Sequence, residues 1–425
     1  MNQDKCMPPT DTQQGTLKPG LLLAPRLEGT ARPPLKVLVL GGSGFLGQRL
    51  LHALADCPGV EALGASRRAS VGPIRTAGVA GKAESRASTR WRELDSCDLP
   101  SVRAALTGMD AVVNCVAGSA TAIAEGARVL VQAALQAGRP RIVHLSSQAV
   151  YGAAEGWVRA NAVPDPDPGL GWYGRAKCQA EAQLRRYAGE GGQSMILRPG
   201  CIHGPGSQLW VGRIGRWLQA GRLGDLGAAG DGWSNLVHVD DVVSALMAAL
   251  WRPLVPGEQP VWNLAAPDSP RWNQYFVDLA LALDATPVRR LGRQLRLDAW
   301  LAGPPLKLAE IALQKIASRT ASDLHLTGRL PEAIPPGLLR LWRQELRLDS
   351  RAATQLGLRF MPYEASLTAS AQWFAAQAQQ QQNQERQHDQ EKVHTLLEAA
   401  RAAPRFRADA PPSGTGPAPE KAGYP

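Results

Sequence analysis

A glycine-rich turn that directly follows a short apolar run is the feature that most restricts how this chain can fold. Residues 37–50 read VLVLGGSGFLGQRL, and Gly41, Gly42, Gly44 and Gly47 separate the apolar run from an amphipathic segment. The glycines fit both a Gly41-x-x-Gly44-x-x-Gly47 and a Gly42-x-Gly44-x-x-Gly47 spacing. Without Cβ atoms a strand can turn tightly into a helix whose first N–H groups face a pyrophosphate. Taken alone, the stretch also suits a tight turn that binds nothing.

Short apolar runs alternate with helical patterns along the following two hundred residues. Strands are expected at 36–40, 60–66, 110–118, 141–147, 194–200 and from 237, and helices at 48–57, 101–108, 122–138, 173–190 and up to 251. Strands separated by helices require parallel, right-handed crossovers. We therefore predict an α/β protein with a Rossmann-like doubly wound parallel sheet and a smaller, mainly helical C-terminal substrate lobe.

The composition changes along the chain predict four parts. Residues 1–34 are rich in Pro, Gln and Thr and are expected to form a disordered leader. A Rossmann cofactor-binding domain is expected at 35–265, with 200–234 contributing to the substrate lobe. The C-terminal substrate-binding lobe is expected at 266–375, and a low-complexity tail at 376–425.

Two segments in the second half leave alternatives open. The amphipathic stretch 297–318 suits a helix that packs on the sheet, and contact with a membrane surface is the weaker alternative. Within the tail, a glutamine-rich polar tract precedes one further possible helix at 393–403.

The composition also excludes several classes of partner. The net charge of +10 is carried mostly by arginine and is not interleaved with aromatic residues, so no nucleic-acid partner is expected. The six cysteines form no C-x-x-C pair, which predicts no metal site and suits a reducing compartment. No run of 18 uncharged apolar residues occurs, so stable membrane insertion is not expected. We predict a cytoplasmic protein that acts on a small molecule.

Three residues form a candidate catalytic set. Tyr173 and Lys177 are four positions apart on an expected helix and therefore face the same side. Ser147 ends an expected strand, at the edge of a parallel sheet where ligands bind. A free tyrosine has a pKa of about 10, and a nearby ammonium lowers it. We expect Tyr173 to exchange a proton with the substrate, Ser147 to hold the substrate oxygen, and Lys177 to lower the pKa of Tyr173.

These motifs occur in a characteristic order. They read GGSGFLG (41–47), CDL (97–99), VVNCVAG (112–118), HLSSQAVYG (144–152), YGRAKCQAE (173–181), LRPGCIHGPG (197–206), NLVHVDD (235–241), WNL (262–264) and RAATQLGLRFMP (351–362). Over about residues 35–375 the sequence resembles the extended short-chain dehydrogenase/reductase family, in the NAD(P)-dependent epimerase/dehydratase superfamily. The family includes epimerases, dehydratases and 3β-hydroxysteroid-type dehydrogenases.

The resemblance implies roles for individual residues. Ser147, Tyr173 and Lys177 would be the catalytic set, with Lys177 also holding the nicotinamide ribose. Besides Tyr173 and Lys177, the cofactor-binding residues would be Gly41, Ser43, Gly44, Phe45, Leu46, Gly47, Ser66, Arg67, Arg68, Asp98, Leu99, Ala117, Gly118, Pro199 and Ile202. With this set downstream, the Gly41/Gly44/Gly47 spacing becomes the better interpretation of the turn.

Two departures from the family pattern narrow the expected function. Gln148 and Ala149 follow Ser147, where sugar-nucleotide 4,6-dehydratases carry an acidic pair for elimination. Cys201 stands where many nucleotide-sugar enzymes place an asparagine that contacts the substrate phosphates. Both favour an oxidoreductase that interconverts a ketone and a secondary alcohol on a fairly apolar substrate, similar to the 3β-hydroxysteroid or β-keto-acid branch.

The end of the second strand bears on the choice of nicotinamide cofactor. An acidic residue there would hold the ribose 2′-hydroxyl, but the strand ends in Ser66, Arg67 and Arg68. Glu61 lies at the opening of the strand, at the wrong end to reach the ribose. Arginine suits phosphate, so NADP(H) is favoured over NAD(H). Alternatively, both arginines are merely solvated in a loop.

Other functions and roles remain open from the sequence. A nucleotide-sugar epimerase with transient oxidation is one alternative, and a non-catalytic cofactor-binding regulatory protein is another. The resemblance also implies a possible homodimer. His203 and His238 are expected to be structural, with Asp240 or Asp241 capping the helix that follows.

Overall fold

The computed structural model describes residues 33–67, 90–165, 171–291, 334–355 and 357–402. The chain divides into two compact units, residues 1–375 and 376–425. Arg68, most of the predicted leader, the amphipathic stretch 297–318 and the tail beyond residue 402 lie outside the described residues.

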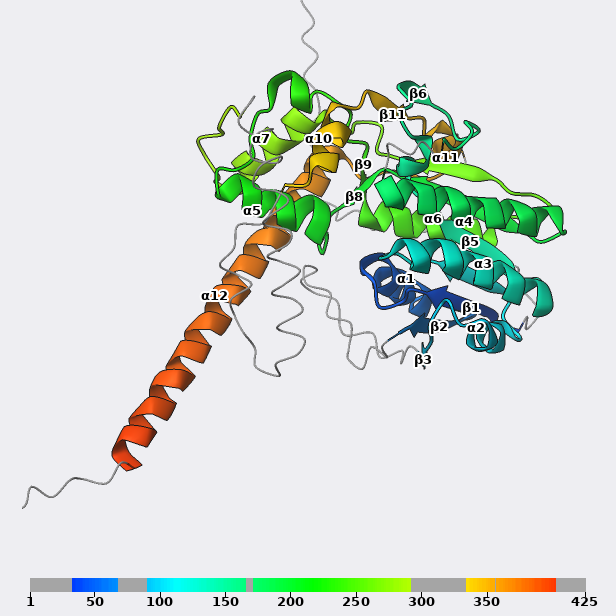
Figure 1. Ribbon diagram of the computed structural model, residues 1–425, viewed down its shortest axis with the longest axis horizontal. Coiled ribbons are helices and arrows are strands. Elements are labelled where there is room, and N and C mark those ends of the chain that lie inside the picture. Colours follow the sequence, from blue (N-terminus) through cyan, green and yellow to red (C-terminus); the bar gives the residue numbers. More distant parts are fainter. Residues whose placement is uncertain (1–32, 68–89, 166–170, 292–333, 356, 403–425) are drawn as a thin grey trace, which may run out of the picture. The chain divides into compact units, whose positions relative to one another are not determined.

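A seven-stranded parallel sheet forms the centre of the first unit (Figure 1). Its strands are β1 (Leu35–Leu40), β2 (Val60–Ser66), β3 (Arg90–Glu93), β4 (Ala111–Asn114), β5 (Arg141–Leu145), β7 (Ser194–Pro199) and β10 (Val261–Leu264). Their order is β10-β7-β5-β4-β1-β2-β3, and every neighbouring pair is parallel. The chain therefore leaves β1 toward β2 on one side and returns to β4 on the other, which is the doubly wound arrangement. The predicted fold class is confirmed.

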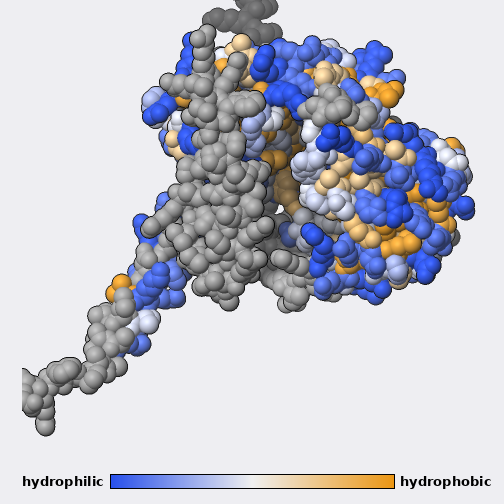
Figure 2. Space-filling view, viewed as in Figure 1, coloured by the Kyte–Doolittle hydropathy of each residue, from blue (hydrophilic) through white to orange (hydrophobic). Residues whose placement is uncertain are grey.

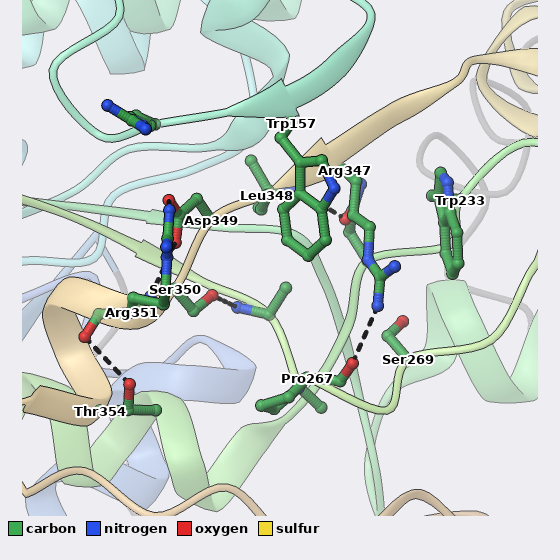
Figure 3. Close-up of a pocket in the computed structure, with 14 residues that line it drawn as sticks. Trp157, Trp233, Pro267, Ser269, Arg347, Leu348, Asp349, Ser350, Arg351 and Thr354 are labelled. Atoms are coloured by element: carbon green, nitrogen blue, oxygen red, sulfur yellow. Dashed lines mark hydrogen bonds and ion pairs between the residues drawn. The ribbon is translucent and has the colours of Figure 1, made fainter.

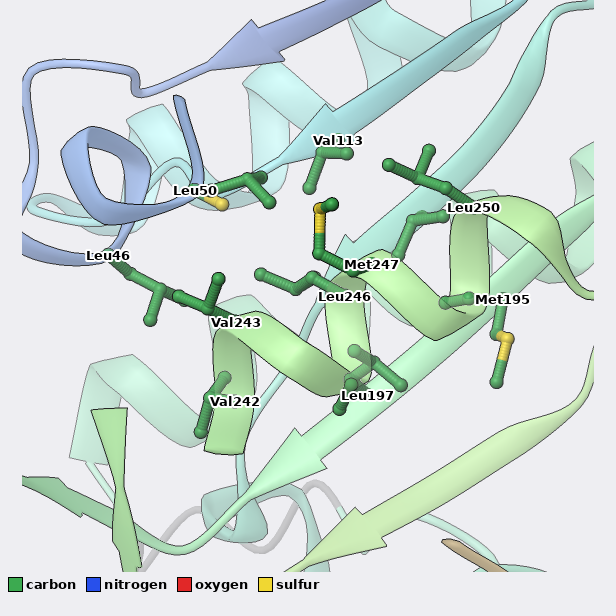
Figure 4. Packing of buried hydrophobic residues seen from close by; sticks show 14 of the residues in the cluster. Leu46, Leu50, Val113, Met195, Leu197, Val242, Val243, Leu246, Met247 and Leu250 are labelled. Atoms are coloured by element: carbon green, nitrogen blue, oxygen red, sulfur yellow. The ribbon is translucent and has the colours of Figure 1, made fainter. Parts of the chain in front are cut away.

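Alternate residues of the strands build two hydrophobic cores, because successive side chains of a strand point to opposite faces. Val37 and Val39 pack with α1 (Phe45–Ala55) and α6 (Val239–Trp251). Figure 4 shows the apolar side of α6 in this core. Leu38 and Leu40 pack on the other face. That face is covered by α2 (Leu99–Leu106), α3 (Ala120–Gln136) and α4 (Gly171–Gly189).

Two strands of the sheet, β3 and β10, were not anticipated, and the strand expected from residue 237 is β9 (Leu236–His238), which lies outside this sheet. β3 is only four residues long, and its sequence RWRE carries three charges. It lies at the edge of the sheet and pairs with β2 alone, so it needs no apolar run of its own.

An aromatic core is built by α5 (Arg213–Gln219), α7 (Trp272–Ala282), α10 (Pro336–Arg343) and the short turns η3 (Gln208–Gly212) and η4 (Gly227–Gly230). The helix α11 (Arg351–Gln355) packs in the core with α1 and α6, and the turn η1 (Gln148–Tyr151) in a smaller cluster with Val158 and Leu346. Trp217, Trp272 and Trp342 are buried together with Tyr275 and Phe276. Two short parallel sheets complete this region: β6 (Gly156–Val158) with β11 (Leu346–Leu348), and β8 (Cys201–His203) with β9 (Leu236–His238).

The end of the described chain is a single helix, α12 (Tyr363–Ala402), of 40 residues. Our prediction of a polar tract followed by a separate helix at 393–403 differs from this. The stretch contains no glycine or proline and is rich in Ala, Gln and Glu, which all favour a helix. Local propensity therefore carries the helix through the polar tract.

The coloured surface in Figure 2 mixes hydrophilic residues with small groups of apolar ones. Within the described residues, the helices are all too short or too polar to cross a membrane.

Candidate active site

The glycine turn joins β1 to α1 at the centre of the sheet. Gly41 has a positive φ of 77°, and a Cβ atom there would lie 2.9 Å from the Cys115 carbonyl oxygen. At Gly47, a Cβ atom would lie 2.3 Å from the carbonyl oxygen of Gly41. Gly41 thus makes the turn, and Gly47 lets the helix approach it. Gly42 instead faces the side chains of Leu51 and Trp91.

The first turn of α1 directly follows the glycine turn, and its N–H groups have no side-chain cap. Gly44 is the N-cap residue in extended conformation and supplies no side-chain cap, and the first turn carries no acidic residue. Ser43 and Gly44 are exposed, while Phe45 is half-buried and Leu46 is buried. An uncapped helix N-terminus that a glycine turn leaves accessible fits a pyrophosphate. The turn therefore has the shape and donors that a dinucleotide needs.

The end of β2 lies beside this turn. The N–H groups of Gly41 and Gly42 both donate to the Ala65 carbonyl oxygen at 3.0 Å. Ser66 and the exposed Arg67 follow directly, which brings them to the side of the turn. Glu61 pairs with Lys36 at the opposite end of the strand.

Sequence reasoning missed an acidic residue near Ser66. Glu93 of β3 is the register partner of Ser66, and the Glu93 side chain is exposed. Only the strand pairing places this carboxylate next to the predicted 2′-phosphate region, because 23 residues separate the two strands in sequence.

Asp98 and Leu99 lie at the start of α2. The Asp98 carboxylate accepts the Ser101 N–H at 3.1 Å and so caps the helix, while its residue remains exposed. Ala117 and Gly118 are exposed in the segment after β4, where Gly118 has a φ of 112°. Their predicted contacts with a cofactor stay predictions.

Ser147 and Tyr173 meet at the end of β5. Their side chains are joined by a hydrogen bond, and both residues are half-buried. Burial raises the pKa of Tyr173 above that of a free tyrosine, and the bond with Ser147 opposes the rise. The two oxygens are therefore placed to reach one substrate atom together, and the phenol keeps its proton at neutral pH.

Lys177 lies one turn further along α4 and is only 2% exposed. Its Nζ donates to the Leu145 carbonyl oxygen at 2.7 Å and lies 3.4 Å from that of Val116. Burial lowers the pKa of Lys177 to about 8. Its Nζ is 5.9 Å from the ring centroid of Tyr173. We expected Lys177 to lower the pKa of Tyr173; in this structure burial raises that pKa, and the opposing effect comes from the hydrogen bond with Ser147.

Pro199 and Ile202 flank a bend between β7 and β8. Pro199 is buried at the end of β7, and Ile202 is half-buried in β8. Between them, a Cβ atom at Gly200 would lie 2.0 Å from the Asn235 carbonyl oxygen, so only glycine fits.

A comparison with protein-family models identifies residues 37–265, which is more than half of the chain, as the NAD dependent epimerase/dehydratase family. The chain belongs to this family. The match includes every predicted catalytic and cofactor-binding residue, although it does not test their individual roles. The prediction that the chain belongs to this family is confirmed.

Two curated proteins illustrate what the chain is similar to in sequence. Protein YeeZ of Escherichia coli (strain K12) is 32% identical over 158 residues, which are 37% of this chain and 52% of that protein. The chain thus spans about half the length of the first relatives it matches. The 2-alkyl-3-oxoalkanoate reductase of Stenotrophomonas maltophilia (strain K279a) is 29% identical over 247 residues, which are 52% of this chain and 67% of that protein.

Solved structures share the fold of this epimerase/dehydratase-family chain. The UDP-glucose 4-epimerase of Thermotoga maritima aligns with a TM-score of 0.57 and 20% identity, over 81% of this chain and 100% of its own. At this identity the likeness concerns the fold alone.

A buried polar network behind Ser147 also escaped sequence reasoning. The Gln148 side chain contacts the Cys201 sulfur at 3.5 Å and accepts a hydrogen bond from Asn235 at 2.9 Å. Asn235 also donates to the Leu346 carbonyl oxygen and accepts the Leu348 N–H. The network ties the turn after Ser147 to β11, more than a hundred residues away in sequence.

A second network holds α4 in place. The Arg198 guanidinium donates to Glu181 at 2.9 and 2.6 Å and to the Tyr151 hydroxyl at 2.8 Å. Glu181 also accepts from Ser146 Oγ at 2.6 Å. The helix that carries Tyr173 is thereby joined to β7 and to the end of β5.

The helix-capping prediction is confirmed in part. Asp241 accepts the backbone N–H of His238, as expected for a capping residue. His238 is itself the N-cap residue, and its Nδ1 accepts the Asp240 N–H at 3.3 Å. His203 is buried with Nε2 2.8 Å from Ser366 Oγ.

Proposed function

We propose that this epimerase/dehydratase-family protein is an NADP(H)-dependent oxidoreductase that interconverts a ketone and a secondary alcohol on a fairly apolar small molecule, of the β-keto-acid or 3β-hydroxysteroid type. The observation that carries the proposal is the hydrogen bond between Ser147 and Tyr173, with the buried Lys177 one turn along the same helix. This set lies at the carboxyl edge of the sheet, where doubly wound folds bind their ligands.

Each residue of the set has a distinct task. The Ser147 hydroxyl donates a hydrogen bond to the substrate oxygen and orients it. In the reducing direction, Tyr173 Oη gives its proton to the same oxygen. The raised pKa of Tyr173 means that the phenol is protonated at neutral pH and can donate this proton. Lys177 is aligned by Leu145 and Val116 and would bind the nicotinamide ribose.

The cofactor would be held by the glycine turn and the strand ends around it. The open first turn of α1 suits the pyrophosphate, and Arg67 supports a preference for the 2′-phosphate of NADP(H). Glu93 is a neighbouring acidic group that would act against this preference. When bound, the nicotinamide ring supplies or accepts the hydride.

Three features support an apolar substrate rather than a sugar nucleotide. Trp172 is 50% exposed, and its ring meets that of Tyr173 edge-on with centroids 5.7 Å apart. Cys201 is buried and replaces a polar amide. Gln148 has its side chain engaged by Cys201 and Asn235, so it is not available for elimination. The similarity to a 2-alkyl-3-oxoalkanoate reductase supports the same substrate class.

Replacing Tyr173 with Phe tests the mechanism. With a 2-alkyl-3-oxoalkanoate as substrate, we expect turnover to fall about 10²- to 10⁴-fold, because the proton donor is lost. NADPH affinity, measured by fluorescence titration, should change little. The matched control is Tyr187→Phe on the same helix, since the Tyr187 hydroxyl donates to the Pro140 carbonyl oxygen, away from Ser147 and Tyr173 in the described residues. Turnover that survives in Tyr173→Phe would contradict the mechanism.

Cofactor titrations test the preference for NADP(H), and turnover assays test the two alternative functions. NADPH should bind more tightly than NADH, and Arg67→Ala should reduce the difference; equal affinities would contradict the preference. A nucleotide-sugar epimerase would turn over without net consumption of NADPH. Tight cofactor binding with no turnover on a broad carbonyl panel would indicate a regulatory protein instead.

A further inference from the structure

A cavity of about 690 Å³ lies apart from the predicted active site. It opens where β6, β11, the segment after β10 and the segment before β9 meet (Figure 3). Its lining includes none of the residues predicted to bind cofactor or to act in catalysis. The volume is within the range of about 300–1,000 Å³ that is typical of small-molecule sites.

A stack of tryptophan and arginine side chains forms one wall of the cavity. The Arg347 guanidinium lies 4.3 Å from the ring centroid of Trp157 and 4.0 Å from that of Trp233. Arg271 covers Trp233 at 4.7 Å and is anchored by Glu345 at 2.6 Å. Such cation–π contacts fix the orientation of the rings. Trp157 is therefore held by Arg347 although it is 64% exposed.

Trp157 lines the cavity, and the Arg347 guanidinium lies over its ring. Figure 3 shows Arg347 on one side of Trp157, and Asp349 with Arg351 on the other. The lining also includes the apolar residues Ala265, Ala266 and Pro267. A flat ring bound in this cavity could stack on Trp157 and contact these apolar residues.

The charges around the cavity favour an anion. Three arginines and one aspartate line it. Asp349 accepts from Arg351 at 2.7 and 3.0 Å, which holds the pKa of Asp349 below its usual range. Arg347 is used in the stack and donates to the Pro267 carbonyl oxygen.

Arg159 is the lining arginine whose guanidinium is not engaged by a hydrogen bond from the described part of the chain. Within the described residues it interacts with the Asp349 carboxylate only through its charge, at longer range than Arg351, and it is exposed. Arg159 also borders a second hollow of about 510 Å³, together with Asp349 and Arg351. The stack of Trp157, Arg347 and Trp233 joins β6 to β11 without Arg159. The positive charge of Arg159 at the cavity is therefore not needed for this joining.

We propose that this cavity binds a small aromatic anion, with its planar ring on Trp157 and its carboxylate or phosphate at Arg159. Arginine binds both groups through its planar fork of N–H donors. The site is separate from the reductase function proposed above and does not depend on it.

Calorimetric titration with 2-naphthoate tests the proposal. NADPH is present throughout, so that the probe does not fill the cofactor region. We expect saturable binding that weakens about tenfold or more in Arg159→Gln, because a charge-assisted hydrogen bond is lost. Trp157→Leu should weaken it several-fold through the loss of stacking. The control Arg103→Gln removes an exposed arginine on α2 and should leave binding unchanged.

Two further probes separate the two halves of the site. Naphthalene-2-carboxamide lacks the charge and should not respond to Arg159→Gln, and cyclohexanecarboxylate lacks the aromatic ring and should not respond to Trp157→Leu. Arg159→Gln breaks no hydrogen bond of the described residues, and Asp349 keeps its hydrogen bonds from Arg351, so this variant tests the proposal even if Trp157→Leu lowers stability. Absence of saturable 2-naphthoate binding, or equal binding by Arg159→Gln and wild type, would overturn the proposal.

Discussion

At the scale of single residues, burial of the Lys177 ammonium lowers the stability of the fold, while the proposed mechanism needs this residue beside Tyr173. Its ammonium is almost fully buried, and its nearest polar partners are two backbone carbonyl oxygens rather than a carboxylate. Desolvation therefore lowers the pKa of Lys177 to about 8. A buried, partly protonated lysine destabilises the fold, and its position beside Tyr173 gives the reason to retain it.

Lys177→Met should reveal this cost through its pH dependence. Between the folded pKa of about 8 and the ordinary 10.5, the unfolded chain binds one more proton than the folded chain. The free energy of unfolding of the wild type should then rise by roughly 1.4 kcal/mol per pH unit relative to the variant. Urea denaturation of both proteins across this window measures the difference. A difference that is independent of pH would show that Lys177 titrates normally.

At the scale of elements, α4 is positioned by a buried ion pair. Glu181 is fully buried, and Arg198 is 2% exposed; their closest N–O distance is 2.6 Å. The pair joins the middle of the helix to β7, so it determines where Tyr173 stands relative to the sheet. Breaking one partner would leave a charge uncompensated in the interior.

Glu181→Gln should lower the free energy of unfolding by about 3–5 kcal/mol, because Arg198 remains buried and charged. The matched control is Glu190→Gln, which breaks the exposed Arg186–Glu190 pair near the end of the same helix. That change should cost no more than about 0.5 kcal/mol. Chemical denaturation compares the two. Equal effects of both variants would mean that the buried pair does not fix the helix.

At the scale of the whole molecule, α12 belongs to both compact units. Up to Phe374 it buries side chains, including Trp373 and Phe374 at 4% and 6% exposure. Gly215 of α5 is one contact, since a Cβ atom there would meet the Phe374 ring at 2.7 Å. Beyond Ala375 the described side chains are mostly exposed.

A chain that ends at Ala375 should therefore unfold within about 2 °C of the full-length protein. A chain that ends at Pro362 loses Trp373 and Phe374 and should be strongly destabilised, because each large aromatic contributes about 3–5 kcal/mol. Scanning calorimetry of the three chains measures the melting temperatures. A large loss on removing only residues 376–425 would show that the second unit stabilises the first.

Much of the sheet could be predicted because its signals are local. The apolar runs and glycine turns mark strands to within a few residues at β1, β2 and β7. The spacing of Tyr173 and Lys177 follows from the helix period alone. The edge strand β3 could not be recognised in this way, since its four residues carry no apolar pattern.

The sequence by itself therefore determined the order of elements, the glycine turn and the residue types of the candidate site. Only the tertiary structure decided that Glu93 lies opposite Ser66, that Arg198 meets Glu181, and that Trp157, Arg347 and Trp233 form one stack. It also decided the pKa of Lys177. Strand register and burial arise when distant segments pack together, and that packing sets both the local dielectric and the neighbours of each charge.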